Sequence, residues 1–231
     1  MRCFSIKFLD LCRRYWHAIN IFTECNYVTA RYIKGLFREI GATEITAIRD
    51  CEDIEFFKII NGSRENLGFK EATLRGQNPF DLTYLDEITR VLSKILIPRL
   101  NQLVEKETST INLYCPMGVG GHIDHLATLL CIRNSLTHLS KAFNIYFYED
   151  LPYASNLIIR QIGLSRFLAY FDHKIKFLNK RNILNEILQA EKNKLISIYE
   201  SQHEGGSYCE KFSITHNDKN NRYESIWSLV S

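Results

Sequence analysis

The 231-residue sequence lacks the long apolar stretches that a membrane span or a secretory signal requires. No stretch approaches the roughly 20 consecutive apolar residues that cross a bilayer. The N-terminal MRCFSIKFLDLCRRYW contains no apolar core of a signal peptide, because charged residues interrupt it at Lys7, Asp10, Arg13 and Arg14. We therefore expect a cytoplasmic protein with no membrane span.

A large excess of one charge is also missing. The chain has 29 lysines and arginines and 26 aspartates and glutamates, and its net charge is +3. Nucleic-acid-binding proteins usually concentrate basic residues on one face, so no nucleic-acid partner is expected. With 45% hydrophobic residues, the composition is that of a globular protein with a substantial core. We predict one domain over residues 1–231.

Paired cysteine motifs are absent as well. The seven cysteines include no Cys-x-x-Cys pair, and their number is odd. This pattern argues against a disulfide framework and against a structural zinc knuckle. Reduced thiols fit the expected cytoplasmic location.

Helical and strand patterns alternate along the chain. Apolar residues at helical spacing predict helices over 4–15, 33–40, 44–60, from 83 onward, 126–136 and 181–200. Pro98 should kink or end its helix. Apolar runs predict strands over 17–23, 111–115 and 144–148, an extended segment over 66–69, and a final edge strand over 223–230. The alternation predicts an α/β, Rossmann-like fold, with a mainly parallel sheet and helices on both faces.

The segment PMGVGGHIDHLATLLCIR, from Pro116 to Arg133, follows a predicted strand directly. Ligands of such sheets bind at the carboxyl ends of the strands. The glycines of this segment, which include Gly120 and Gly121, allow a sharp turn and a close approach of the backbone to a ligand. His122 and His125 flank Asp124 at the start of the next helix, where both rings can face the same side. Imidazole is a good zinc ligand, and a nearby carboxylate can fix its tautomer. The alternative is that the histidines are ordinary loop residues and Asp124 caps the helix.

These residues carry a family resemblance. The segment GVGGHIDHLA resembles the second motif of the PIG-L/LmbE-like N-acetylglucosaminyl deacetylases. Five further segments resemble parts of the family's sequences and follow one another in the same order as in the family: INIFTECNYVTA, IRDCEDIEFF, NLGFKEATLRG, FYEDLPYA and KLISIYESQ. The resemblance covers about Phe4 to Gln202, and the His-Ile-Asp-His loop and FYEDLPYA are its most specific parts.

The resemblance implies a zinc hydrolase that removes acetyl from an N-acetylglucosamine-type sugar conjugate. It implies that His125 is a metal ligand and that His122 stabilises the oxyanion or acts as general acid, with Asp124 orienting it. Zinc lowers the pKa of its bound water, which then attacks the amide carbonyl. Arg49 is the candidate for positioning the substrate, together with Gly120 and Gly121. Equally, Arg49 could form an ion pair with Glu52 or Asp53 on its own helix.

The family's first motif, His-Pro-x-Asp-Asp or His-Leu-Asp-Asp after the first strand, has no counterpart in this chain. That motif supplies two metal ligands and the carboxylate that activates water, and a catalytic zinc normally takes three protein ligands. We considered Glu24 as a substitute ligand, because it ends the strand over 17–23. The first strand is also expected to be missing. Either residues 2–8 move into the gap as a strand, or the recorded start is too late.

Three functions remain after this reasoning. The first is a zinc-dependent amidohydrolase of the PIG-L/LmbE type whose recorded start is too late. The second is a non-catalytic relative that binds a sugar or a protein partner without metal. The third is a nucleotide-binding α/β domain, which is the weakest, because the glycine turn has neither a P-loop lysine nor the G-x-G-x-x-G spacing.

Overall fold

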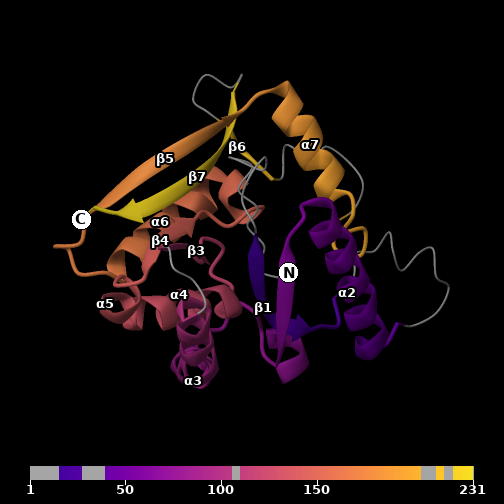
Figure 1. Cartoon of the computed structure of the whole chain (residues 1–231), viewed down its shortest axis with the longest axis horizontal. Coiled ribbons are helices and arrows are strands. Elements are labelled where there is room, and N and C mark those ends of the chain that lie inside the picture. The colour runs from indigo at the N-terminus through magenta and orange to yellow at the C-terminus, as the bar shows by residue number, and fades with distance from the viewer. Residues whose placement is uncertain (1–15, 28–39, 106–109, 204–211, 216–220, 231) are drawn as a thin grey trace. The chain divides into compact units, whose positions relative to one another are not determined.

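The computed structural model describes residues 16–27, 40–105, 110–203, 212–215 and 221–230. The helices predicted over 4–15 and 33–40 lie outside these residues, apart from position 40, and so does the strand considered for residues 2–8. Contacts within the chain define two compact units, Met1–Asn78 with Leu184–Lys211, and Pro79–Ile183 with Phe212–Ser231. Figure 1 labels the elements of both units. The assignment of the whole chain to one domain stays a prediction.

The described residues of the first unit form a two-stranded parallel sheet and two α-helices. Its elements are β1 (His17–Glu24), α2 (Ala42–Ile59), β2 (Ser63–Lys70), the 3-10 helix η1 (Ala72–Arg75) and α7 (Glu186–Ile196). The predicted strand over 17–23, the helix over 44–60 and the extended segment over 66–69 are therefore confirmed. Phe56 and Phe57 of α2 pack with Leu195 and Tyr199 in a buried cluster. This cluster joins α7 to α2 within the unit.

The second unit contains a five-stranded sheet flanked by helices. Its helices are α3 (Leu85–Val104), α4 (Ile123–Asn134), α5 (Leu136–Leu139), the 3-10 helix η2 (Tyr153–Ser155) and α6 (Leu157–Ala169). Its strands are β3 (Ile111–Pro116), β4 (Phe143–Tyr148), β5 (Phe177–Leu184), β6 (Ile214–Thr215) and β7 (Arg222–Leu229). The strand order is β3-β4-β7-β5, and β6 pairs with β7.

The prediction of an α/β fold is confirmed, but the mainly parallel sheet is confirmed only in part. β3 and β4 are parallel, as are β1 and β2, whereas β4–β7 and β6–β7 are antiparallel. The described strands therefore form one parallel pair and one mixed sheet. The strand over 223–230 exists, yet it is not an edge strand, since β7 lies between β4 and β5.

Two predicted helices have different bounds from those expected. α3 continues to Val104 with Pro98 inside it, so Pro98 does not end the helix. The helix predicted over 181–200 begins only at Glu186, because Asn185 caps it by accepting a hydrogen bond from the Leu188 N–H. The preceding residues, up to Leu184, belong to strand β5.

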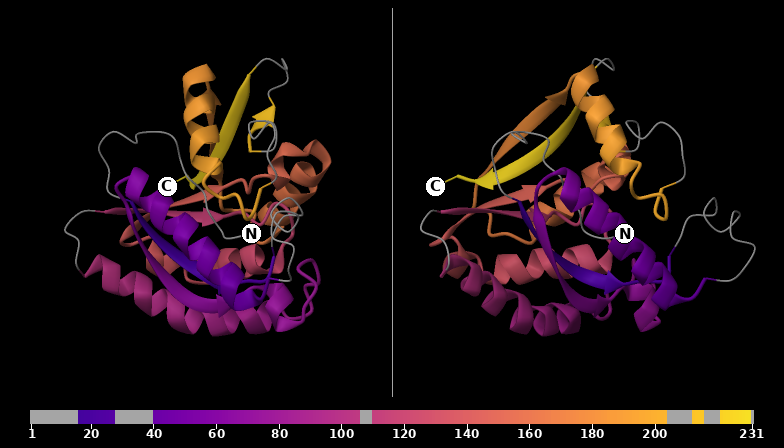
Figure 2. Two further views of the ribbon diagram at one scale, coloured as in Figure 1. Left: turned by 90° about the vertical axis from the view of Figure 1, so that its right-hand side faces the viewer. Right: turned by 45° about the vertical axis from the view of Figure 1, so that its right-hand side comes forward.

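Helices α3 and α4 lie side by side, as Figures 1 and 2 show. On α3, buried leucines and isoleucine recur every three or four residues, at Leu85, Ile88, Leu92, Leu96 and Leu100. From Ile123 to Ile132, α4 is buried throughout. A helix that is buried all round holds its first residues in a fixed position, and these residues carry the histidine motif.

Aromatic side chains attach α6 to the sheet of the second unit. The ring of Phe167 on α6 lies 5.2 Å from Phe147 on β4 and 5.1 Å from Phe177 on β5, between ring centroids. Such edge-on and tilted pairs add about 0.5–1.5 kcal/mol each beyond the burial of their area. In the described part of the chain, no helix combines the length and apolar character needed to cross a membrane.

Candidate active site

The glycine turn connects β3 to α4 at the carboxyl end of β3. Gly118 and Gly121 have φ angles of 67° and 79°, which side-chain-bearing residues rarely adopt. The Gly121 N–H donates to the Gly118 carbonyl at 2.9 Å and closes the turn. Because β3 and β4 are parallel, the loop after β4 lies at the same edge of the sheet. The predicted location of the motif at this edge is therefore observed.

His125 is held by a carboxylate from the loop after β4. Its Nδ1 lies 2.6 Å from Asp150 Oδ1, and both side chains are buried. A carboxylate only accepts hydrogen bonds, so Nδ1 carries the hydrogen and donates it. The other oxygen, Asp150 Oδ2, accepts the Val119 N–H at 2.9 Å. Asp150 thus fixes both the imidazole and the glycine turn.

The opposite nitrogen of His125, Nε2, is buried and has no hydrogen-bond partner among the residues that the structure describes. A buried Nε2–H would be an unsatisfied donor, so the tautomer with a bare Nε2 lone pair is favoured. A histidine whose Nδ1–H is bonded to a carboxylate and whose Nε2 lone pair is free is the arrangement found at metal-bound histidines. Nothing in the structure tests the assignment of His125 as a metal ligand, which stays a proposal.

His122 presents the opposite protonation pattern. It is the N-cap of α4, and its Nδ1 accepts the Asp124 N–H at 3.3 Å. An accepting Nδ1 leaves the hydrogen of a neutral ring on Nε2. The Asp124 carboxylate lies 3.9 Å from the same Nδ1, beyond hydrogen-bond distance. Asp124 therefore holds His122 through its backbone N–H, and its carboxylate lies close enough for an ion pair when the ring is protonated.

The two imidazoles lie close together, with 5.2 Å between their ring centroids. They are nearly buried, with 9% of His122 and 4% of His125 exposed. The Phe80 ring is 6.0 Å from His122, and the Tyr153 ring is 6.2 Å from His125. The pair combines one ring whose Nε2 can donate with one whose Nε2 can accept. Such a pair can polarise a carbonyl and bind an electrophile at the same time.

The space beside Gly120 and Gly121 is filled by side chains of the same unit. A Cβ at Gly120 would lie 2.3 Å from Cγ of Tyr153, and a Cβ at Gly121 would lie 2.7 Å from Nη1 of Arg166. Both glycines therefore permit close contacts with the protein itself. Their proposed contact with substrate, on their remaining faces, is not tested.

Helix α6 approaches the turn through its own glycine. A Cβ at Gly163 would lie only 2.3 Å from the Val119 carbonyl oxygen. Contact of this kind requires a residue without a side chain, which explains a glycine inside a helix where it costs roughly 1 kcal/mol relative to alanine. This contact positions Arg166, one turn further along, against the turn.

Glu149, which precedes Asp150, is not available to a ligand. Its carboxylate is completely buried and accepts hydrogen bonds from Arg160 and from the Trp227 indole, the latter at 3.0 Å. These contacts join β4, α6 and β7 around the start of the loop. Glu149 thus stabilises the loop that carries Asp150.

Arg49 belongs to the first unit and is completely buried. Its Nη1 forms an ion pair with Glu71 Oε1 at 3.0 Å, and its Nη2 donates to the Tyr27 carbonyl at 2.7 Å. This ion pair is with a residue outside its helix, and on its own helix the charge of Arg49 also lowers the pKa of Glu52, against the rise that burial causes. These contacts give Arg49 a structural role in its unit, and its substrate-positioning role stays a prediction.

Glu52 and Ser201 also interact within the first unit. Ser201 donates its backbone N–H and its hydroxyl to the two oxygens of Glu52, each at 2.7 Å. Burial raises the pKa of Glu52 above 4.5, and the hydrogen bonds from Ser201 oppose this rise. Ser201, which lies after the end of α7, thus attaches this segment to α2.

The described residues do not by themselves fit a catalytic zinc. His125 offers one buried imidazole nitrogen that has no partner in the described part of the chain. Within the ranges that the structure describes, no group of three or more histidine, cysteine, aspartate or glutamate side chains could hold a metal ion. A catalytic zinc takes three protein ligands. Glu24 ends β1 as predicted, and no observation supports it as a substitute ligand.

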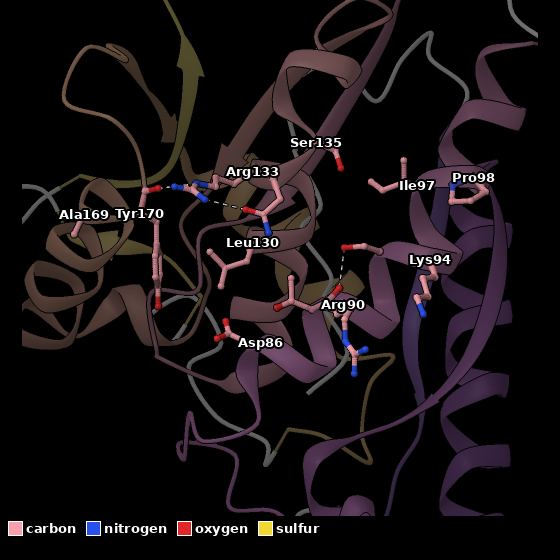
Figure 3. A pocket seen from close by; sticks show the side chains of 13 residues that line it. Asp86, Arg90, Lys94, Ile97, Pro98, Leu130, Arg133, Ser135, Ala169 and Tyr170 are labelled. Atoms are coloured by element: carbon pink, nitrogen blue, oxygen red, sulfur yellow. Dashed lines mark hydrogen bonds between the residues drawn. The ribbon is translucent and has the colours of Figure 1, made fainter.

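A pocket of about 960 Å³ opens elsewhere in the second unit (Figure 3). Residues of α3 and of the ends of α4 and α6 line it, and none belongs to the histidine motif or to the glycine turn. Of its three cations, Arg90, Lys94 and Arg133, the last is already bonded to the Tyr170 carbonyl and to Asn134. At the glycine turn, His122 and His125 offer a hydrogen-bond donor and a free lone pair side by side. We therefore take the turn, and not this pocket, as the candidate active site.

Comparison with known proteins supports the fold. No model of a protein family matches the chain, and no curated protein matches it in sequence. Solved structures do match: the A40926 pseudoaglycone deacetylase Dbv21 has 16% identity and a TM-score of 0.55, over 93% of this chain and 84% of its own. A deacetylase of teicoplanin biosynthesis, in its bog complex, has 13% identity and a TM-score of 0.61, over 93% and 86%. The zinc-inhibited form of teicoplanin deacetylase Orf2 has 14% identity and a TM-score of 0.57, over 93% and 86%.

The chain therefore has the LmbE-like fold of these deacetylases, as the sequence resemblance implied. At this level of identity the likeness concerns the fold, and the site has to be argued from its own residues.

Proposed function

We propose that this protein acts on the acetamide of an N-acetylglucosamine-type sugar conjugate, as an N-acetyl amidohydrolase of the LmbE-like type. The main support is the pair of imidazoles, His122 and His125, at the carboxyl edge of the sheet. Their ring centroids are 5.2 Å apart, and their Nε2 atoms have opposite hydrogen-bonding character. The shared fold with deacetylases that act in glycopeptide biosynthesis supports the choice of an acetylated amino sugar.

The residues have distinct roles in this proposal. The Nε2–H of His122 donates to the amide oxygen as negative charge develops there, or supplies a proton to the leaving amine. Asp124 helps to hold this ring through its backbone N–H. Asp150 holds the hydrogen of His125 on Nδ1, which leaves the Nε2 lone pair on the other side of the ring for a ligand. Tyr153 packs on Gly120 and against His125, so it forms a wall of the same site.

Zinc is part of this proposal through His125 alone. The described residues supply no further ligand set, so no step of the reaction is assigned to the metal.

Acetate release and zinc content test the proposal together. The full chain is incubated with N-acetylglucosamine conjugates, with and without added zinc, and compared with His122→Ala and His125→Ala. His173→Ala is the matched control, since the side chain of His173 is 91% exposed. We expect loss of at least about 100-fold in rate for His122→Ala, the usual effect of one oxyanion donor or general acid, and no change for the control. After dialysis we expect substantially less than one zinc per chain.

Absence of acetate release under all these conditions would refute the hydrolase. A second function is favoured by the incomplete metal site, namely a relative that binds the sugar without hydrolysis. It predicts calorimetric binding of a neutral N-acetylglucosaminide that is weakened in His122→Ala while no acetate appears. Stoichiometric zinc that vanished in His125→Ala would contradict this alternative.

A further inference from the structure

Arg166 places a positive charge on the turn that precedes His122. Its guanidinium lies across Gly121, with Nη1 at 2.7 Å and with Cζ and Nη2 at 3.3 Å from the position that a Cβ would take. The contact of Gly163 with the Val119 carbonyl fixes α6 at this distance. The cation is therefore held by packing and not by an opposite charge.

Arg166 differs from the other charged residues around the turn. Asp150 is bonded to His125 and to the Val119 N–H, and Glu149 is bonded to Arg160 and to Trp227. Among the described residues, no hydrogen bond or ion pair is found for the Arg166 side chain, and its Nη1 is shielded from solvent. A buried donor without a partner is rare in folded proteins, because water no longer satisfies it.

Two further features at this position favour negative charge. α4 begins at Ile123, directly after the turn, and the start of a helix carries a partial positive charge. Arg166 as a whole is half-buried, and the planar donors of a guanidinium match the oxygens of carboxylate and phosphate groups. The two acids of the loop after β4, Glu149 and Asp150, already have their partners.

We propose that Arg166 and the Gly121 turn form a subsite for an anionic group, a carboxylate or a phosphate, carried by the sugar conjugate. An oxyanion on this guanidinium supplies the partner that Arg166 lacks and lies next to the imidazole pair. This inference rests on the proposed function, because it assigns a charge to the conjugate whose acetamide faces His122. It adds that acidic amino-sugar conjugates are preferred to neutral ones.

Calorimetric titration of the full chain tests the subsite with three sugars at low salt. They are N-acetylglucosamine 1-phosphate, N-acetylmuramic acid and methyl N-acetylglucosaminide, so that phosphate, carboxylate and neutral ligands are compared. We expect at least one anionic sugar to bind ten-fold or more tightly than the neutral one. In Arg166→Gln this preference falls below two-fold while the neutral sugar binds as before.

Arg166→Lys keeps the charge without the planar donors and should retain part of the preference. Arg90→Gln on α3 removes an exposed arginine outside the turn and should leave all three affinities unchanged. Equal binding of charged and neutral sugars by the wild-type chain, or a preference that survives Arg166→Gln, overturns the subsite.

A titration with inorganic phosphate separates this inference from the proposed function. The signal is the shift of the arginine side-chain Nε–H resonance that disappears in Arg166→Gln. If no sugar binds but phosphate shifts this resonance, the sugar function fails and the anion subsite stands. If phosphate leaves the resonance unchanged and no anionic sugar is preferred, the subsite fails, whatever happens to the neutral sugar.

Discussion

Asp150→Asn should change which nitrogen of His125 carries the hydrogen. In the wild-type protein, Asp150 accepts from both the imidazole Nδ1–H, at 2.6 Å, and the Val119 N–H, at 2.9 Å. Asparagine has the same shape but offers one acceptor and one donor group. If its oxygen keeps the Val119 N–H, its amide group faces Nδ1 and forces the hydrogen onto Nε2. If it is flipped, two donors meet at Val119 and the turn is disturbed.

The cost of this change follows from burial. The Asp150 side chain is 1% exposed, so water cannot replace a lost hydrogen bond. Hydrogen bonds to charged groups contribute about 1.5–3 kcal/mol each, so Asp150→Asn should lower the free energy of unfolding by about 1.5–3 kcal/mol. Asp150→Ala removes both bonds and leaves two buried groups without partners, and should cost about 3–5 kcal/mol.

Nitrogen-15 NMR of histidine-labelled protein measures the tautomer directly, and urea unfolding measures the stability. The His125 signals are assigned by their absence in His125→Ala. We expect hydrogen on Nδ1 in the wild-type protein and on Nε2 in Asp150→Asn. Asp172→Asn is the control, because the side chain of Asp172 is 56% exposed. An unchanged tautomer, with a change in unfolding free energy below about 0.5 kcal/mol, would refute the role given to Asp150.

Three other substitutions test the packing around both units. Burial raises the pKa of Glu52 above 4.5, so the folded state binds this proton more tightly than the unfolded state does. The free energy of unfolding should therefore rise as the pH falls from neutrality through the folded pKa toward about 4.5. Glu52→Gln should flatten this part of the pH profile in urea titrations, and an unchanged slope would assign it to another group. Glu149→Gln breaks a buried ion pair with Arg160 and should lower the free energy of unfolding by about 3–5 kcal/mol. The double variant Glu149→Leu with Arg160→Met should restore part of this loss. Additive losses in thermal unfolding would contradict the ion pair's role. Gly121→Ala requires an unfavourable φ of 79° and should cost about 1–2 kcal/mol in chemical unfolding, whereas Gly41→Ala, with open space around it, should cost far less.

The arrangement of strand, glycine turn, histidine motif and helix could be predicted from the sequence because all its determinants are local. The apolar run over 111–115, the glycines and the start of α4 follow each other directly, and they bring His122 and His125 to one place. The partner of His125 could not be found in this way. Asp150 is 25 residues away on the loop after the neighbouring strand, and only the pairing of β3 with β4 brings it to the ring. The resemblance of FYEDLPYA pointed to this segment without identifying the contact.

Helix α6 and strand β5 were not predicted, for opposite reasons. α6 lacks the alternation of apolar and polar faces, since Leu157, Ile158 and Ile162 are exposed while Phe167 is buried. β5 has four consecutive polar residues at 179–182 that interrupt its apolar positions, and Ile183 with Leu184 could equally begin a helix. Tertiary packing on Phe147 decides both elements, and a sequence pattern contains no record of it.

Because Gly163 has no side chain, helix α6 packs directly against the backbone of the turn. The distance between α6 and the Val119 carbonyl is consequently as short as a residue without a Cβ allows. Every larger residue at position 163 would move the helix away from the turn. Such a lift would carry Arg166 off the turn while leaving both histidines in place on α4. A single methyl group at a position that meets no ligand could therefore retune the charge of the site without altering any group that takes part in chemistry.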